Sequence, residues 1–570
     1  MKRAPKQDES KPGEMETDSP KKGTADLPIQ YPVKPKRPYP GFRKNFYDYF
    51  AEYSNNTGIH GFKYMGEQER TIFERLWWFV LFCISLYICI NLIIQTWIKW
   101  DTSPVLVSFA RSPTPVWQVP FPAVTVCSET KAKQTKYNFT ENYHRMISSN
   151  NTMTEHEKKQ FADLALVCEN HLYTEGNLTT GYDTLDFLMS ISPQFDEMLW
   201  SCKWTLQNET CRNFFTPILT EDGMCFTFNM LDRTELYKNN VFLPGDFMSH
   251  NRRSDGWTLE GGYPMDADID TYPRRAMSAG FSAGFFLLLR AYEQDLDYIC
   301  RGPVPGFKIL LHNPAEVPRV GMQYFRAPLN QEVVVAVKPD MMTTSDGLKD
   351  YDPHRRQCYF PNERQLAFYK SYTQQNCEVE CLTNFTLARC KCVAYHMPHE
   401  EGTPICGSGN LKCMFEAQTE LLQIEVQSGL NSIDDEEGLN ITSKCDCLPA
   451  CTSLVYNAET SQADFQFEKL FQAFKANLSE FPGVQLTRIT IFFKEQQFIT
   501  SERNELYGET DFLANCGGLL GLFTGFSFLS IVEIVYFLSL RLICNVKKYG
   551  RHYWSGSPEL VNNDAYIHKK

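Results

Sequence analysis

Residues 512–540 read FLANCGGLLGLFTGFSFLSIVEIVYFLSL, and this stretch decides the fold. It is long and apolar enough to cross a bilayer, yet it contains the acidic residue Glu533 and an interruption at Gly525-Phe526-Ser527. A carboxylate near mid-membrane costs about 2.5 to 3.5 kcal/mol on insertion scales, so such a residue usually faces water or a partner. The stretch is therefore interpreted as pore-lining; the alternative is a packing face of small residues.

Residues 76–98 form a second apolar stretch, 23 residues long and without a formal charge. At 1.5 Å per residue a helix of this length spans about 34 Å, which matches the hydrocarbon core of a bilayer. Some 75 polar and basic residues precede it. This is far too many for the n-region of a secretory signal, so the stretch is predicted to remain as the first membrane span.

The distribution of charge predicts the orientation. Residues 1–75 carry 14 Lys/Arg against 11 Asp/Glu, and residues 541–570 carry 6 against 2. Residues 76–540 carry 36 against 55. Because positive flanks stay in the cytoplasm, both termini are predicted to be cytoplasmic, with roughly 410 residues outside the cell.

The cysteines indicate an oxidising compartment. Of the 20 cysteines, 16 lie between Cys127 and Cys451, an even number that favours disulfides. The Cys-x-Cys pairs at 390–392 and 445–447 could instead bind zinc, but their spacing is not that of zinc fingers, and no metal site is predicted. Free thiols are expected for the three membrane-associated cysteines Cys83, Cys89 and Cys544, and the state of Cys516 is left open.

Asn-x-Ser/Thr acceptors in the outer segment are candidate N-glycosylation sites. They lie at Asn138, Asn150, Asn177, Asn208, Asn384, Asn440 and Asn477. Asn55 also matches, but it should stay unmodified on the cytoplasmic side.

The outer segment mixes short β-type runs with helical stretches, which predicts an α+β domain with more than one lobe. The expected strands are residues 123–127, 226–229, 308–312, 333–337 and 486–493. The expected helices are residues 142–147, 155–168 and 465–476. The first forty residues are rich in Lys, Pro and acidic residues, and they are expected to be disordered.

Four motifs resemble the degenerin and epithelial sodium channel superfamily, over nearly the whole chain from His60 to the second span. They are His60-Gly61; Phe121-Pro122-Ala123-Val124-Thr125-Val126-Cys127; Gly223-Met224-Cys225-Phe226-Thr227-Phe228-Asn229; and the cysteine series from Cys358 to Cys451 followed by the Gly-x-Ser at 525–527. Within the superfamily, residues 256–263 and 514–523 look most like the insect pickpocket branch.

The resemblance implies a membrane protein with two transmembrane helices, a large disulfide-rich α+β extracellular domain and an acid-sensing-channel-like trimer. The implied segments are a largely disordered cytoplasmic tail (1–59), a pre-span His-Gly loop (60–75), helix 1 (76–98), the extracellular domain (99–510) with a Cys-rich helical lobe (about 358–451), the pore segment (511–541) and a cytoplasmic tail (542–570).

The resemblance also implies roles for individual residues. Gly525, Phe526 and Ser527 would form the selectivity filter, with Glu533 as a carboxylate ring below it, and backbone or hydroxyl oxygens would replace part of a cation's hydration shell. Phe526 replaces a small residue of many relatives, and Tyr536 stands where acid-sensing relatives carry a second acidic residue.

Two further positions are implied to act in gating. His60-Gly61 would lie on a loop that enters the membrane, where a glycine tolerates positive φ; the alternative is an ordinary cytosolic turn. Ala514 occupies the site where a bulky side chain is expected to hold degenerin channels open, so Ala514→Val should raise the resting current.

The family's cysteine pattern implies a nested ladder with two shared pairs outside it. The implied pairs are Cys358-Cys451, Cys377-Cys447, Cys381-Cys445, Cys390-Cys413, Cys392-Cys406, Cys127-Cys225 and Cys202-Cys211. Cys168 and Cys300 are left over and are available to pair with each other.

The predicted function is a subunit of a trimeric, sodium-selective, amiloride-sensitive and voltage-independent plasma-membrane channel, homomeric or built with related subunits, in a sensory setting. No cofactor other than the permeant Na⁺, no nucleic-acid partner and no enzymatic motif is predicted; lipid surrounds the spans. The alternatives are a non-conducting regulatory subunit and a two-span surface receptor. Gating is predicted to occur through the extracellular domain by a chemical or mechanical stimulus, and the particular ligand or stimulus is not identified. Neither tail contains the Pro-Pro-x-Tyr motif of epithelial sodium channel subunits.

Overall fold

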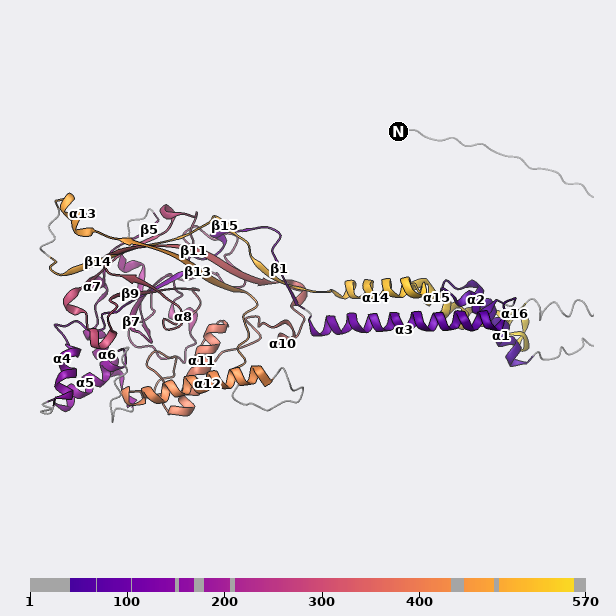
Figure 1. Ribbon diagram of the computed structural model, residues 1–570, viewed down its shortest axis with the longest axis horizontal. Helices are drawn as coiled ribbons and strands as arrows, with labels where there is room; N and C mark the ends of the chain where they lie inside the picture. Colours follow the sequence, from indigo (N-terminus) through magenta and orange to yellow (C-terminus); the bar gives the residue numbers. More distant parts are fainter. Residues whose placement is uncertain are drawn as a thin grey trace, which may run out of the picture. The chain divides into compact units, whose positions relative to one another are not determined.

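The computed structural model describes residues 41–67, 69–103, 105–148, 153–168, 179–205, 211–431, 445–475 and 481–557. The chain divides into two compact units, which are described separately (Figure 1). The helical unit comprises Met1–Gln95 and Leu513–Lys570, and the disulfide-rich unit comprises Thr96–Phe512.

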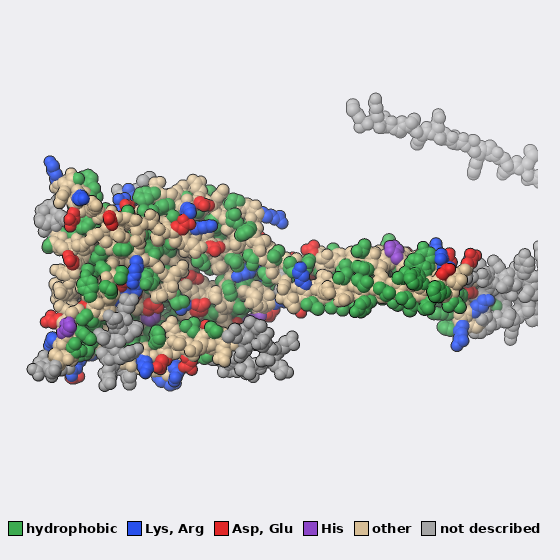
Figure 2. Space-filling model, viewed as in Figure 1, with side chains coloured by type: hydrophobic (Ala, Val, Ile, Leu, Met, Phe, Trp, Pro, Cys, Tyr) green, Lys and Arg blue, Asp and Glu red, His purple; other side chains and the backbone are tan. Residues whose placement is uncertain are grey.

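Long apolar helices build the helical unit. Helix α3 covers Ile72–Thr102 and has a mean hydropathy of 2.3 in its most apolar window, and the continuous helical run Phe528–Tyr549 reaches 1.8. Both are long and apolar enough to cross a membrane. Their large side chains face outward: Tyr87 is 71% exposed and Leu538 is 72% exposed. Figure 2 shows hydrophobic side chains covering this part of the molecule.

The second half of the helical unit is segmented. Helix α14 (Glu509–Thr524) ends at the predicted interruption, and α15 (Phe528–Tyr536) begins after it. A π-helical turn (Phe537–Arg541) and α16 (Leu542–Tyr549) follow. The expected break at residues 525–527 is therefore confirmed as an interruption of the helix.

The tail that is expected to be largely disordered (residues 1–59) contains an ordered helix towards its end. Helix α1 (Phe42–Asn56) and helix α2 (Phe62–Gly66) are ordered elements, while residues 1–40 lie outside the described residues. The reason is tertiary: α1 buries small and polar residues such as Asn45 and Ala51, and its aromatic residues pack on the end of the chain, contacts that composition alone does not reveal.

A seven-stranded sheet forms one layer of the disulfide-rich unit (Figure 1). Its strand order is β1-β16-β11-β14-β8-β5, and β13 also pairs with β11. The strands are β1 (Val105–Phe109), β5 (Leu199–Trp204), β8 (Phe285–Tyr292), β11 (Gln331–Thr344), β13 (Ser453–Asp464), β14 (Val484–Phe493) and β16 (Ser501–Glu505).

A five-stranded sheet has the order β10-β9-β3-β7-β6. Its strands are β3 (Ala123–Ser128), β6 (Phe215–Thr220), β7 (Gly223–Phe228), β9 (Gly306–His312) and β10 (Phe325–Pro328), and short pairs join β12 (Ile405–Cys406) to β4 (Thr179–Thr180) and β15 (Gln497–Phe498) to β2 (Thr114–Pro115). Residues from both large sheets share one hydrophobic core, in which the rings of Phe228 and Phe285 stack 4.0 Å apart. The five expected strands all fall within observed strands, apart from Asn229, which lies just past the end of β7.

The helices of this unit lie around the sheets. They are α4 (Phe139–Ile147), α5 (Glu155–Ala165), α6 (Tyr182–Ile191), α7 (Phe195–Met198), α8 (Arg233–Leu236), α9 (Tyr298–Arg301), α10 (Pro353–Arg356), α11 (Gln374–Cys390), α12 (Leu411–Asn431) and α13 (Phe467–Ala473). The three expected helices correspond to α4, α5 and α13. Helices α11 and α12 form the helical lobe within the predicted Cys-rich region.

Candidate pore and gating site

The break in the second apolar segment has a defined local geometry. Gly525 adopts φ +70°, a left-handed conformation that favours glycine, and its N–H donates to the Gly521 carbonyl at 2.9 Å. Ser527 then caps α15: its Oγ accepts from the Ser530 N–H at 3.4 Å, and its own N–H donates to Ser530 Oγ at 3.2 Å. The sequence therefore stops one helix and starts another within three residues.

The His60-Gly61 segment lies against this break. The His60 N–H donates to the Thr524 carbonyl at 2.9 Å, which satisfies one of the carbonyls that the end of α14 leaves open. Gly61 has φ +81°. A Cβ on Gly525 would lie 2.7 Å from Cδ2 of the His60 ring, closer than real contacts allow. The break and the His-Gly pair therefore fit each other only because Gly525 has no side chain.

Glu533 contacts the same segment. The Gly58 N–H donates to Glu533 Oε2 at 3.3 Å, and Gly58 lies two residues before His60. Glu533 is partly exposed, which suits a carboxylate that meets both the loop and water. The structure thus brings together the predicted residues His60, Gly525 and Glu533.

The remaining predicted pore and gating residues occupy different positions. Phe526 is partly exposed, while Ser527 and Ala514 are exposed. Ala514 lies on α14, ten residues before Thr524, and is not part of the cluster around His60. Tyr536 is 41% exposed and ends α15.

Sequence reasoning missed a clasp between the two ends of the helical unit. Asn45 on α1 is fully buried: its Nδ2 donates to the His552 carbonyl at 3.0 Å, and its Oδ1 accepts from Ser555 Oγ at 2.8 Å. The Tyr49 ring lies 5.5 Å from that of Trp554. We call these contacts the terminal clasp. The aromatic spacing in residues 42–53 was the available signal, but it does not name a partner.

Three more contacts join α1 to the π-helical turn. Arg541 pairs with Glu52, and the Tyr49 hydroxyl donates to the Phe537 carbonyl. The Tyr53 ring lies 5.3 Å from that of Phe537. Because α1 leads directly into the His-Gly segment, these contacts connect that segment with the end of the second apolar helix.

A second joint lies within the disulfide-rich unit, where α3 ends and α14 begins. The Trp100 ring stacks on Phe512 with centroids 5.4 Å apart, and Trp100 Nε1 donates to the Tyr507 carbonyl at 3.1 Å. The Arg355 guanidinium lies 4.8 Å from the Trp100 ring centroid and also pairs with Asp101 at 3.4 Å. Arg355 belongs to α10 and lies three residues before Cys358, so this joint adjoins the disulfide ladder.

Seven disulfides join described cysteines. They are Cys127-Cys225, Cys168-Cys300, Cys358-Cys451, Cys377-Cys447, Cys381-Cys445, Cys390-Cys413 and Cys392-Cys406. Six of these pairs are those that the family resemblance implies, and the seventh joins the two left-over cysteines, Cys168 and Cys300. Cys202 is disulfide-bonded, and the side chain of its expected partner Cys211 lies outside the described residues. Cys83, Cys89, Cys516 and Cys544 are free.

Two predicted glycosylation acceptors can be located. Asn384 on α11 is exposed, whereas Asn138 caps α4 and is partly buried. Asn150, Asn177, Asn208, Asn440 and Asn477 lie outside the described residues.

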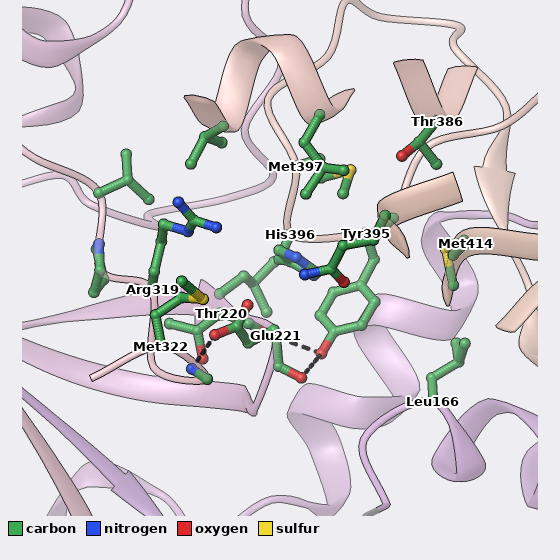
Figure 3. Close-up of a pocket in the computed structure, with 18 of the residues that line it drawn as sticks. Leu166, Thr220, Glu221, Arg319, Met322, Thr386, Tyr395, His396, Met397 and Met414 are labelled. Atoms are coloured by element: carbon green, nitrogen blue, oxygen red, sulfur yellow. Dashed lines mark hydrogen bonds between the residues drawn. The ribbon is translucent and has the colours of Figure 1, made fainter. Parts of the chain in front are cut away.

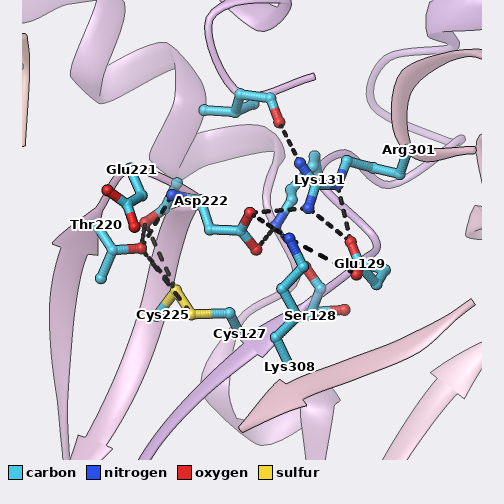
Figure 4. A network of polar contacts seen from close by, with 12 residues as sticks. Cys127, Ser128, Glu129, Lys131, Thr220, Glu221, Asp222, Cys225, Arg301 and Lys308 are labelled. Atoms are coloured by element: carbon cyan, nitrogen blue, oxygen red, sulfur yellow. Dashed lines mark hydrogen bonds and ion pairs between the residues drawn. A yellow bond between two sulfur atoms is a disulfide. The ribbon is translucent and has the colours of Figure 1, made fainter. Parts of the chain in front are cut away.

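A buried ion network stabilises the hairpin of β6 and β7 (Figure 4). Asp222, in the turn of that hairpin, contacts Lys131 at 3.0 Å, Arg301 at 2.8 Å and Lys308 at 3.1 Å, and Arg301 also pairs with Glu129 at 2.7 Å. Burial opposes the charge on Asp222, yet the three cations hold the pKa of its carboxyl below the ordinary value. Burial also lowers the pKa of Lys131 to about 8.

Comparison with known proteins defines the class. The model of the amiloride-sensitive sodium channel family matches residues 53–537. Pickpocket protein 28 of Drosophila melanogaster is 30% identical over 508 residues, which cover 86% of this chain and 78% of that protein. The sodium channel protein Nach of Drosophila melanogaster is 22% identical over 90% of both chains. Acid-sensing ion channel 1 of Gallus gallus is 22% identical over 85% of this chain and 82% of that protein.

The chain is an ion-channel subunit with two apolar membrane helices and a disulfide-rich α+β extracellular domain. It belongs to the amiloride-sensitive sodium channel family, and its relatives include Drosophila pickpocket proteins, Nach and acid-sensing channels.

Proposed function

We propose that this chain is a subunit of a trimeric, sodium-selective, amiloride-sensitive channel in the plasma membrane, with both termini in the cytoplasm and gated through its extracellular domain. The observation that carries the proposal is the packing of the His60-Gly61 segment against the break at Gly525. That packing couples the loop before the first span to the segment proposed as the selectivity filter.

The proposed pore follows from the broken helix. Three copies of residues 525–527 would surround one axis and offer backbone and hydroxyl oxygens to a partly dehydrated cation. Glu533 lies on α15, six residues after Ser527, and three copies of it would form a ring of carboxylates that concentrates cations. The excess of acidic over basic residues in the outer domain adds attraction, screened beyond about 8 Å at physiological salt.

Voltage independence follows from the charge content of the spans. Residues 76–98 carry no formal charge, and residues 512–540 carry Glu533 alone. Voltage sensors move several basic side chains through the membrane field, and these stretches have none to move.

The outer domain is proposed to sense the stimulus and to transmit the resulting motion to the membrane segments. The joint of Trp100, Phe512 and Arg355 connects the span ends within the disulfide-rich unit to α10, and the disulfide at Cys358 fixes the chain that follows α10. A stimulus that shifts the helical lobe therefore has a stiff route to the ends of both membrane segments. Asn138 and Asn384, together with the acceptors outside the described residues, are proposed to carry glycans.

The test is expression of the chain alone in oocytes, with sodium current recorded with and without amiloride. An amiloride-blocked current that Glu533→Ala alters and that Ala514→Val raises at rest supports a self-sufficient sodium channel. Glycosylated protein at the surface without current contradicts that proposal and favours a non-conducting subunit that requires partners. Equal sodium and potassium currents would contradict sodium selectivity.

A further inference from the structure

A cavity of about 330 Å³ lies in the disulfide-rich unit between the helical lobe and the β6–β7 hairpin (Figure 3). Helices α11 and α12 supply one wall, and the hairpin turn at 219–221 supplies another. The loops at 317–322 and 394–397 complete it. None of these residues belongs to the pore and gating site.

The cavity wall is mainly apolar. Its apolar residues include Leu219, Val317, Leu382, Met397, Leu411 and Met414. Methionine side chains adapt to irregular partners, so such a wall accepts an apolar body without demanding one shape. At the rim, Met322 is 67% exposed and Phe415 is 65% exposed, which leaves an entrance from solvent.

The charged groups near the cavity are already engaged. Arg319 pairs with Glu378 at 2.7 Å. The carboxylate of Glu221 accepts the Gly321 N–H, and Glu221 is exposed at the edge. A charged ligand would therefore have to compete with an existing partner or leave its own charge uncompensated.

Two uncharged polar groups of the wall have no partner among the described residues. They are the buried atoms Nδ1 of His396 and Oγ1 of Thr386. The neighbouring Tyr395, by contrast, donates its hydroxyl to the Thr220 carbonyl at 2.9 Å. Burial lowers the pKa of His396, so its imidazole is neutral and can both donate and accept. Unsatisfied buried polar groups are rare and require an explanation.

We propose that this cavity binds a small uncharged amphipathic molecule, with an apolar body against the methionine and leucine wall and one hydroxyl or amide group directed at His396 and Thr386. Since a water molecule takes about 30 Å³ in the liquid, the volume admits a body of roughly a dozen non-hydrogen atoms. The inference deepens the proposed function, on which it rests, by giving the class of extracellular ligand.

The cavity lies between two parts of the domain that disulfides hold in place, so a bound ligand can affect their relative position. The disulfide Cys390-Cys413 joins α11 to α12, and Cys377-Cys447 and Cys381-Cys445 fix α11 to the chain that follows the lobe. The opposite wall is fixed through Cys127-Cys225. A bound molecule would therefore contact two disulfide-linked parts of the domain at once and restrict their movement relative to each other.

Binding can be measured without any current. Met322→Cys, at the rim, is labelled on intact oocytes with N-phenylmaleimide, and the labelling rate is followed as 1-naphthol is added. We expect saturable slowing of about tenfold or more. The control is Met265→Cys, because Met265 is fully exposed and does not line the cavity, and its labelling should not change. The wild-type chain gives the background of the four free cysteines.

The polar end is tested with a shape-matched pair of probes. Adding His396→Phe or the isosteric Thr386→Val to Met322→Cys should weaken protection by 1-naphthol about tenfold, because a hydrogen bond is lost. Protection by 1-methylnaphthalene, which lacks the hydroxyl, should be unchanged. Surface labelling of each variant establishes that it folds and is exported.

The outcomes separate the site from the channel proposal. Absence of protection up to the solubility limit of 1-naphthol overturns the site, whatever the currents show. Equal protection by both probes in every variant overturns the assignment of His396 and Thr386. Protection without any effect of 1-naphthol on sodium current supports the site and counts against gating through it.

Discussion

The two units of this channel subunit are stabilised in different ways. The disulfide-rich unit has a core shared by two sheets, a buried ion network and seven disulfides among its described cysteines. The helical unit exposes most of its large side chains, and its described cysteines are all free. Its internal arrangement depends on hydrogen bonds such as those of His60 and Asn45, on the ion pair of Arg541 with Glu52, and on aromatic contacts. A part without covalent cross-links can rearrange at lower cost than a part that disulfides hold together.

The sharpest test of this difference is Gly525→Ala. A left-handed conformation costs a non-glycine residue about 1 to 2 kcal/mol, and the new Cβ would also press on His60. We expect the sodium current to fall roughly tenfold or more at equal surface expression, while the disulfides of the other unit still form.

The matched control for this variant is Gly518→Ala, because a Cβ there meets nothing within 4 Å in the chain. Adding His60→Ala to Gly525→Ala removes the contact and should restore part of the current. An unchanged current in Gly525→Ala would show that the packing of the His-Gly segment on the break does not control conduction.

Removing a disulfide should have the next largest effect, on stability. Cys127→Ala with Cys225→Ala cuts a buried cross-link between β3 and β7. We expect a loss of about 2 to 5 kcal/mol in the free energy of unfolding of the disulfide-rich unit, measured by denaturant unfolding of the purified chain. Cys544→Ser, which removes an exposed free thiol, should leave that value unchanged. Equal stability of both variants would contradict the contrast between the units.

The terminal clasp can be tested with Asn45→Ala. The substitution leaves the Ser555 hydroxyl and the His552 carbonyl without their buried partner, which costs about 1 to 3 kcal/mol. Trypsin should then cleave faster near Lys547 and Lys548. Asn56→Ala, an exposed change on the same helix, should not alter the rate. Adding Ser555→Ala to Asn45→Ala should cause little further loss; full additivity would mean that the two residues act separately.

The smallest expected effect is a change in pH dependence through Lys131. Burial lowers its pKa from 10.5 to about 8 in the folded chain, so the folded state binds fewer protons than the unfolded state between these values. Stability from this group therefore rises as the pH rises through that window. Lys131→Met should remove this rise in the melting temperature, whereas the exposed Lys494→Met should retain it. If the melting temperature rises equally with pH in the wild type, Lys131→Met and Lys494→Met, Lys131 is excluded as the source of the rise.

Sequence patterns predicted the parts of the fold that depend on local hydrophobicity. The apolar runs at β3, β9 and β14 are buried on both faces or nearly so, which makes them visible in the sequence. Strand β13 was missed because it is largely exposed and polar over 453–464. Helices α11 and α12 were expected only through the family resemblance, since disulfides rather than an apolar stripe fix their positions.

In the candidate site too, some features could be predicted from the sequence and others could not. Glu533 and the small-residue break were visible because each is costly or unusual within an apolar stretch. That His60 packs on Gly525, or that Asn45 meets Ser555 some 500 residues later, could not be predicted, because such pairs leave no periodic signal in either segment.

The sequence by itself determined that the chain has two apolar spans, a break in the second span, an acidic residue beyond the break and an oxidised outer domain. These properties follow from composition and order along the chain, through the cost of burying charge and the chemistry of cysteine. The tertiary structure alone decided which segments meet: the His-Gly loop at the break, the terminal clasp and the cavity with two unpartnered polar groups. Contacts between distant residues depend on packing and hydrogen-bond satisfaction in space, and these quantities exist only once the chain is folded.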